Sequence, residues 1–170
     1  MTLKKYILHQ LREMQREMTV ALRGLSPEQL HARPPGQENH IAWIVQHCCI
    51  NVDALLHRST TGRFAISHTD RFLDWPTSPP GDGEQFPDAN ALLDRWTHVT
   101  EGGIAAIASL DEAQLLGPGQ VSGEEPIVQI CLRVINHQNA HLRQIWMVLG
   151  GLRLSGKRWP TQGTWLANGD

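Results

Sequence analysis

The sequence predicts an all-α protein, a four-helix bundle. Four segments of the 170-residue chain carry apolar side chains at intervals of three and four residues, the spacing of a helix with one buried face. No segment alternates apolar and polar residues for long enough to form a sheet, and four such helices with one long connection are typical of a bundle. We expect one domain over residues 1–170, with the bundle at about residues 3–150 and a C-terminal tail at residues 151–170.

The apolar spacing places the first helix at about residues 3–25 and the second at about residues 39–57. Gly24 ends the first helix, and Ser26-Pro27-Glu28 favours a short capped turn after it. Asn39 is the candidate cap of the second helix. One face of this second helix carries a stripe of side chains that includes two histidines: His40, Ile44, His47, Asn51 and Leu55.

The last two helices follow a long connection. Residues 58–87 are rich in Thr, Gly, Pro, Ser and Asp, and a loop of this length often carries function or closes over a site. The third helix is expected over residues 88–110, where Gly102-Gly103 indicates a kink or a close helix contact. The fourth is expected over residues 126–149, ended by Gly150-Gly151. Apolar side chains can anchor the loop and pack the tail on the bundle or on a second subunit: Phe64, Ile66, Phe72, Leu73 and Trp75 in the loop, Trp159 and Trp165 in the tail.

Composition limits the partners and the compartment. A net charge of -2 offers no basic surface to a nucleic acid or an anionic membrane. No apolar run approaches the roughly 20 residues that cross a bilayer, and the N-terminus becomes polar too early for a secretory signal. Three cysteines, of which Cys48 and Cys49 are adjacent, make no disulfide framework. We therefore expect a cytoplasmic protein.

Two of the nine histidines form the most informative motif. His137 and His141 lie four residues apart in a strongly helical segment, so their side chains share one face, one turn apart. Two imidazoles placed in this way can hold one transition metal ion from the same side. Both lie on an apolar stripe and are expected to point into the bundle, together with Ile130, Val134, Ile145 and Val148.

A metal site needs a third ligand from another helix. His47 is the best candidate, and His40 competes with it from two turns earlier on the same stripe. We prefer His47 because His40 falls in the first turn, near the end of the bundle. The alternative to a metal is a set of core histidines, each hydrogen-bonded to a carbonyl oxygen or to Asn51. Two inward histidines at this spacing with a third on another helix favour the metal.

Neighbouring residues limit the chemistry. In H-E-x-x-H peptidases a Glu follows the first His as general base, but here Gln138 holds that position and cannot take a proton, which argues against a zincin-type peptidase. Gln144, one turn after His141, could orient a ligand or a bound water, or contact another helix. Cys48 is rotated by about 100° from His47 on a helix. All three cysteines are expected to be small buried residues.

These motifs together resemble the DinB/YfiT-like superfamily of metalloenzymes. The resemblance rests on Asn39-His-Ile-Ala-Trp-Ile-Val-Gln-His47 and His137-Gln-Asn-Ala-His-Leu-Arg-Gln144, with support from Gly-Leu-Ser-Pro-Glu-Gln-Leu at residues 24–30 and Arg-Pro-Pro-Gly at residues 33–36. It covers about residues 3–150. It implies an up-down-down-up bundle, often a homodimer, with one divalent Zn, Ni, Fe or Mn ion bound by three histidines: His47, His137 and His141.

Members of this superfamily with known chemistry include transferases and isomerases that depend on mycothiol or bacillithiol, in which the metal binds the cofactor thiol. For this chain the resemblance implies a metal-dependent enzyme that activates a low-molecular-weight thiol, or water, for transfer to an electrophilic small molecule. Three neutral histidines leave the charge of the ion uncompensated and a coordination position open, as in catalytic sites. No carboxylate lies on the faces of the three histidines, which favours thiol activation. Arg63 and Arg71 are candidate partners for an acidic thiol, or solvated surface residues.

Two alternatives stay open. One is a metal-dependent hydrolase that uses bound hydroxide. The other is a non-catalytic metal-binding or ligand-binding stress protein, whose site would be closed by a fourth ligand such as His40 or His68.

Overall fold

The computed structural model describes residues 1–33, 36, 38–66, 87–121 and 123–152. The first helix, α1, spans Leu3–Leu22 and begins at Thr2, whose hydroxyl accepts a hydrogen bond from the backbone N–H of Lys5. It ends three residues before the expected boundary. The expected capped turn is a short helix, α2 (Pro27–His31), which begins at Ser26. The side chains of Ser26 and Gln29 each bond the other residue's backbone N–H, a reciprocal cap that fixes this start.

The second long helix consists of three consecutive segments: α3 (Ile41–Val52), the π-helical turn η1 (Asp53–His57) and α4 (Arg58–Thr61). The expectation that Asn39 caps it is wrong. His40 is the cap, because its Nδ1 accepts a hydrogen bond from the backbone N–H of Trp43 at 3.1 Å. The helix also runs four residues past the expected end and stops at Gly62, whose φ of 77° is readily adopted only by glycine.

The third long helix, α5 (Ala89–Ser109), begins at its cap Asp88, as expected within a residue. The sequence interpretation missed α6 (Glu112–Leu116), although Asp111 and Gln114 form the same reciprocal cap as at α2. The last helix, α7 (Ile127–Gly151), includes the two glycines that were expected to stop it. The helix ends two residues later than expected, and neither glycine adopts the left-handed conformation of a cap.

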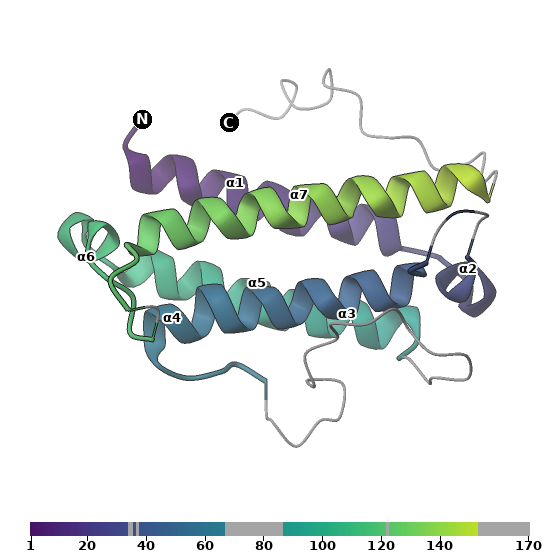
Figure 1. The fold of residues 1–170 in the computed structure, drawn as a ribbon, viewed down its shortest axis with the longest axis horizontal. Helices are drawn as coiled ribbons and strands as arrows, with labels where there is room; N and C mark the ends of the chain where they lie inside the picture. The colour runs from purple at the N-terminus through teal and green to yellow at the C-terminus, as the bar shows by residue number, and fades with distance from the viewer. Residues whose placement is uncertain (34–35, 37, 67–86, 122, 153–170) are drawn as a thin grey trace.

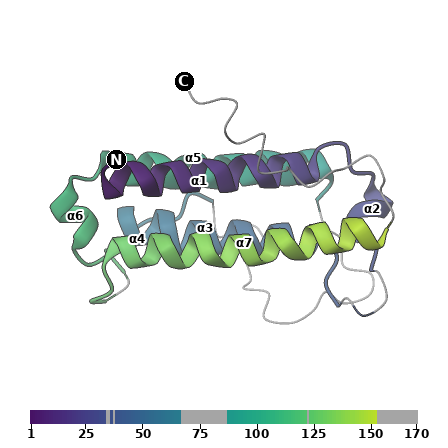
Figure 2. The ribbon, with the colours of Figure 1, turned by 90° about the horizontal axis from the view of Figure 1, so that it is seen from above.

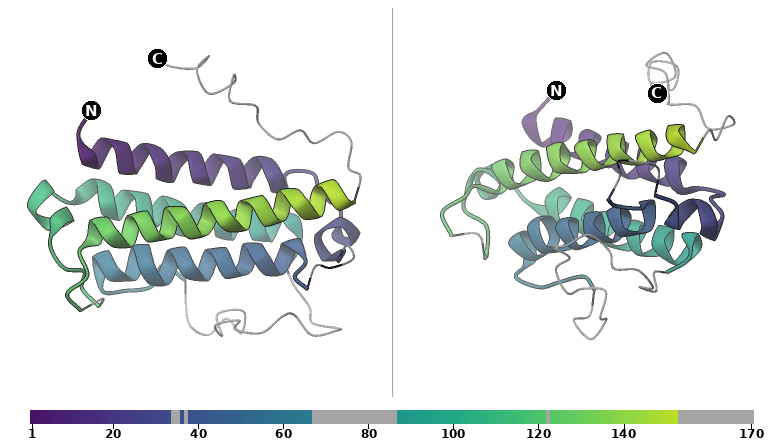
Figure 3. Two further views of the ribbon diagram at one scale, coloured as in Figure 1. Left: turned by 45° about the horizontal axis from the view of Figure 1, so that its top comes forward. Right: turned by 45° about the vertical axis from the view of Figure 1, so that its right-hand side comes forward.

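The four long helices form two layers, one of α1 and α5 and the other of α3 and α7 (Figure 2). Each long helix packs against its two neighbours in the ring α1–α5–α3–α7, one in its own layer and one in the other. Figure 1 shows that α1 and α7 run one way and α3 and α5 the other, the expected up-down-down-up order. The short helices α2 and α6 lie at opposite ends of the bundle (Figure 3). None of the described helices is long and apolar enough to cross a membrane.

The glycine pair of α5 marks a close helix contact, one of the two expected alternatives. A Cβ atom at Gly103 would lie 2.7 Å from Cδ2 of Leu56 in η1, and one at Gly102 would lie 3.2 Å from Cδ2 of His57. An added Cβ at Gly103 would force the Leu56 side chain to shift, and one at Gly102 would make an unusually tight contact with the His57 ring. The two glycines therefore let α5 approach the π-helical turn.

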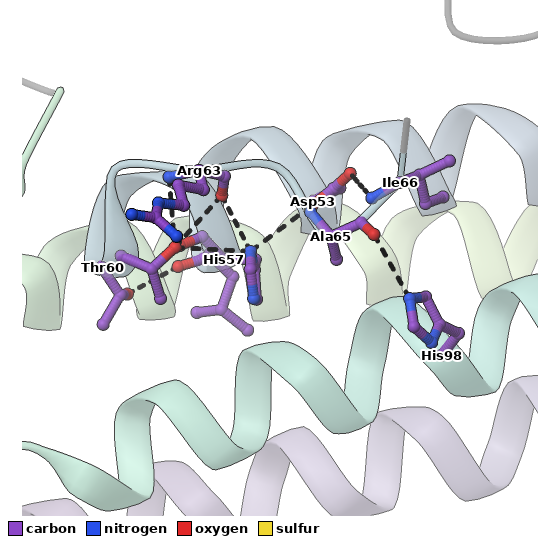
Figure 4. A network of polar contacts seen from close by, with 9 residues as sticks. Asp53, His57, Thr60, Arg63, Ala65, Ile66 and His98 are labelled. Carbon is purple, nitrogen blue, oxygen red and sulfur yellow. Dashed lines mark hydrogen bonds and ion pairs between the residues drawn. The ribbon is translucent and has the colours of Figure 1, made fainter. Parts of the chain in front are cut away.

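The segment after α4 is held to the bundle through a buried carboxylate of η1. Asp53, only 1% exposed, accepts hydrogen bonds from the backbone N–H groups of Ala65 and Ile66 at 2.6 and 3.1 Å (Figure 4). His98 of α5 bonds the carbonyl oxygen of Ala65 at 3.3 Å. Ile66 also packs against the hydrophobic core, as expected. Phe64, another expected anchor, lies beneath the guanidinium of Arg58, whose Cζ is 4.6 Å from its ring centroid. The remaining expected anchors lie outside the described residues: Phe72, Leu73, Trp75, Trp159 and Trp165.

Candidate metal centre

Three histidine rings from two helices converge at one point between α3 and α7. His47 comes from α3, and His137 and His141 come from consecutive turns of α7. The Nε2 atom of His137 lies 3.1 Å from Nε2 of His47 and 3.2 Å from Nε2 of His141. All three candidate ligand atoms lie within 4.8 Å of one another, and all three side chains are half-buried. The structure thus brings together the three residues that the sequence singled out.

Hydrogen bonds among the rings do not account for this convergence. A ring nitrogen carries either one proton or one lone pair, so Nε2 of His137 can form only one well-aligned hydrogen bond. It nevertheless approaches two other ring nitrogens at hydrogen-bonding distance. Asn51, the partner considered for core histidines, accepts a hydrogen bond from the amide of Gln138.

The spacing of the nitrogens fits a metal ion. Bonds of about 2.0–2.1 Å to a tetrahedral zinc ion hold two imidazole nitrogens roughly 3.3 Å apart. The observed separations from His137 are 3.1 and 3.2 Å. Three neutral nitrogen donors on two rigid helices could therefore hold a divalent transition metal without rearrangement of the backbone.

The environment keeps the three rings uncharged. Burial, and then the neighbouring His141, lowers the pKa of His47 to about 4, and burial with the two other histidines lowers the pKa of His137 to about 4. Burial also lowers the pKa of His141, against the opposing effect of its hydrogen bond to Gln144. No carboxylate is among the causes of these shifts. At neutral pH the ring lone pairs are available to a cation.

Two neighbours orient the ligand rings. Trp43, one turn before His47 on α3, stacks on its imidazole with ring centroids 5.2 Å apart and planes 3° apart. Gln144 bonds Nδ1 of His141 through Oε1 at 2.6 Å, so this residue contacts a candidate ligand on its own helix rather than another helix. The sequence interpretation did not assign Trp43 to the site. Its position four residues before a candidate ligand was the signal that it belongs to the site.

Gln138 does not face the metal centre. It is fully buried, and its Nε2 donates to the backbone oxygen of Cys48 and to Oδ1 of Asn51, both at 3.3 Å. The residue at the position of the peptidase general base therefore joins α7 to α3 within the core.

The competing ligand candidates do not join the three rings. His40 is used as the cap of α3 and belongs to no group of three ligands among the described residues. The three cysteines are buried and free, and burial raises the pKa of Cys49 and of Cys131 to about 12 and that of Cys48 well above its usual value.

The cationic candidates are not part of the described site. Arg63 follows the end of α4, where the chain turns back, and its carbonyl oxygen bonds Nδ1 of His57, ten residues after His47 on the same helix. His68 and Arg71 lie outside the described residues. Of the remaining histidines, His9, His31 and His98 are exposed, while His57 is half-buried and bonds the carbonyl oxygen of Arg63.

The fold and the site define a class of protein: an all-α bundle with three convergent histidines on two of its helices. Comparison with family models matches residues 10–145 to the DinB superfamily, and the chain belongs to this superfamily. A search of curated proteins finds no match.

Proposed function

We propose that the protein is a metal-dependent enzyme in which His47, His137 and His141 bind a divalent transition metal such as Zn, Ni, Fe or Mn. The observation that carries the proposal is the approach of three neutral Nε2 atoms at metal-ligand spacing. Three protein ligands leave at least one coordination position for a small molecule, the pattern of catalytic rather than structural sites. The half-buried position of the rings supports access from solvent.

The bound ion would supply Lewis acidity, which lowers the pKa of a coordinated thiol or water and yields a nucleophilic anion at neutral pH. The chain's own residues would position the ligand rings and the two helices that carry them. Trp43 packs on one ligand ring, Gln144 orients another, and the interhelical hydrogen bonds of Gln138 hold the two helices in register. In this proposal the rigid donors leave the ion ready to accept its ligand without reorganisation.

A separate small thiol is the preferred nucleophile, acting on an electrophilic small molecule. No carboxylate among the described residues joins the three histidines, so the site offers no evident general base for hydrolysis. The chain's own thiols cannot take the role, because all three cysteines are buried and their raised pKa values keep them protonated at neutral pH.

The first test is elemental analysis of tag-free protein. We expect about one metal equivalent per chain in the native protein and none in His137→Ala. The matched control is His9→Ala, which removes an exposed histidine of α1 and should retain the metal. Absence of metal from the native protein, even after exposure to Zn, Ni, Mn and anaerobic Fe(II), would overturn the proposal.

Activity then separates the reaction classes. The loaded protein would be given low-molecular-weight thiols with model electrophiles, and separately esters and amides without a thiol. Turnover that requires the thiol and is lost in His137→Ala supports the proposal. Turnover of esters or amides alone would contradict the proposal and indicate a hydrolase. Stoichiometric metal binding with neither activity would contradict it and indicate a non-catalytic metal-binding protein.

A further inference from the structure

The contact between Gln144 and His141 decides which nitrogen of His141 carries a proton. Oε1 of Gln144 lies 2.6 Å from Nδ1 of His141. An amide oxygen can only accept a hydrogen bond, so Nδ1 of His141 is the donor. A neutral imidazole has a single N–H, and its other nitrogen, Nε2, must then present a lone pair. That lone pair faces Nε2 of His137, 3.2 Å away.

The helix itself builds this contact. Gln144 follows His141 by three residues on α7, and side chains of an α-helix lean toward its N-terminus. The amide of Gln144 therefore reaches back over the imidazole one turn earlier. Gln144 is exposed, so the contact needs no support from the core, and replacement of this side chain should leave the fold intact.

His137 lacks a comparable partner. Its Nδ1 is buried and has no hydrogen-bond partner among the described residues, so no bond at Nδ1 fixes its proton. Its Nε2 instead faces the lone pair that Gln144 imposes on His141. In the metal-free protein the favourable arrangement places the proton of His137 on Nε2, where it can be donated to His141.

We propose that Gln144 is a positioning residue that fixes the metal-binding tautomer of His141 and, through it, the position of the proton on His137. In metal-free protein His141 carries its proton on Nδ1 and His137 carries its proton on Nε2. Metal binding needs the Nε2 lone pair of both rings, so the proton of His137 moves to Nδ1 and no net proton is released by this ring. This inference rests on the proposed metal site, but its first part concerns the metal-free protein alone.

The tautomers are measured by nitrogen-15 NMR of the imidazole rings at pH 7.5, with resonances assigned through His137→Gln and His141→Gln. We expect Nδ1–H for His141 and Nε2–H for His137 without metal, and Nδ1–H for both after addition of zinc. In Gln144→Met, which keeps the length of the side chain and removes the acceptor, His141 should populate Nε2–H. A native His141 in the Nε2–H form, or a Gln144→Met variant with an unchanged tautomer, would overturn the proposal.

Zinc affinity, measured by competition with a chromophoric chelator, gives the second readout. Loss of a hydrogen-bond partner of a ligating histidine typically weakens metal binding by about 10-fold to 100-fold. We expect about a 10-fold loss in Gln144→Met and recovery in Gln144→Glu, whose carboxylate retains the acceptor. Arg143→Ala, at the neighbouring exposed position, is the control and should bind as the native protein does. Equal zinc affinity of the native and Gln144→Met proteins would refute the positioning role of Gln144. Absence of zinc binding by the native protein would instead refute the proposed metal site. The NMR experiment would then test by itself whether Gln144 fixes the tautomer of His141.

Discussion

Gln138 of α7 and Asn51 of α3 are joined by a hydrogen bond of 3.3 Å in the core of the bundle. Asn51 lies one turn after His47, and Gln138 directly follows His137, so the bond joins the two helices beside the three converging rings. A second bond from the same amide reaches the backbone oxygen of Cys48. Because polar groups are rarely left unpaired in a core, this pair fixes how the two helices face each other.

Gln138→Leu should lower the free energy of unfolding by about 1–3 kcal/mol, because the substitution leaves the buried amide oxygen of Asn51 without its donor. Urea unfolding of metal-free protein gives the value. The double variant Gln138→Leu/Asn51→Leu should lose less stability than the two single variants together, with a coupling of about 0.5–3 kcal/mol. Strictly additive losses would mean that the two amides do not stabilise the fold as a pair.

Gln138→Glu recreates the sequence of a zincin-type helix, yet we expect no peptidase activity from it. The new carboxylate would lie against the oxygen of Cys48 and Oδ1 of Asn51, both acceptors, and away from the three histidines. Its ionised form is therefore unfavourable in the core, and the variant should be less stable than the native protein at neutral pH. Casein hydrolysis by the zinc-loaded variant, above the level of native protein, would show that residue 138 can reach the metal centre.

Metal-free protein should lose stability as the pH falls from about 6.5 to 4. The pKa values of His40, His47 and His137 are each lowered to about 4, with burial as the largest cause. Histidines of the unfolded chain titrate near 6.5, so the unfolded state binds more protons in this interval. The stability is therefore greatest above pH 6.5 and decreases as the pH falls from 6.5 to about 4, where the folded-state histidines also become protonated. Chemical denaturation at several pH values measures it.

A variant at His40 isolates one part of this pH dependence. His40→Asn keeps a side chain that can cap α3 and removes one titrating group. Its free energy of unfolding should fall less steeply between pH 6.5 and 4 than that of the native protein. Parallel curves for the two proteins would contradict a titrating role of the buried cap.

Gly103→Ala should destabilise the fold by about 1–3 kcal/mol, because the added methyl group meets the buried side chain of Leu56. Gly150→Ala is the matched control. It also lies inside a long helix, but its added Cβ has no atom within 4 Å. There the better helix propensity of alanine should raise stability by up to about 1 kcal/mol. Thermal unfolding of both variants distinguishes a close contact at Gly103 from a general effect of glycine in a helix.

Most of the helical framework was predictable from the sequence because a buried helix face leaves a periodic apolar pattern that needs no knowledge of the partner. The long helices match their expected ranges within a few residues. The errors concern the ends, where single side chains decide. His40 was not recognised as a cap, the continuation through the π-helical turn to Thr61 was missed, and α6 was overlooked despite its Asp111–Gln114 cap.

The sequence by itself determined the chemical types at the site and one local relation: His137 and His141 share a helix face because four residues make about one turn. Only the tertiary structure decided the remaining relations. The packing of α3 on α7 selects His47 rather than His40 as the third converging ring and turns Gln138 into the core. Helical periodicity fixes the direction of a side chain relative to its own axis. The contact it makes across the bundle depends on the depth and register at which the two helices pack.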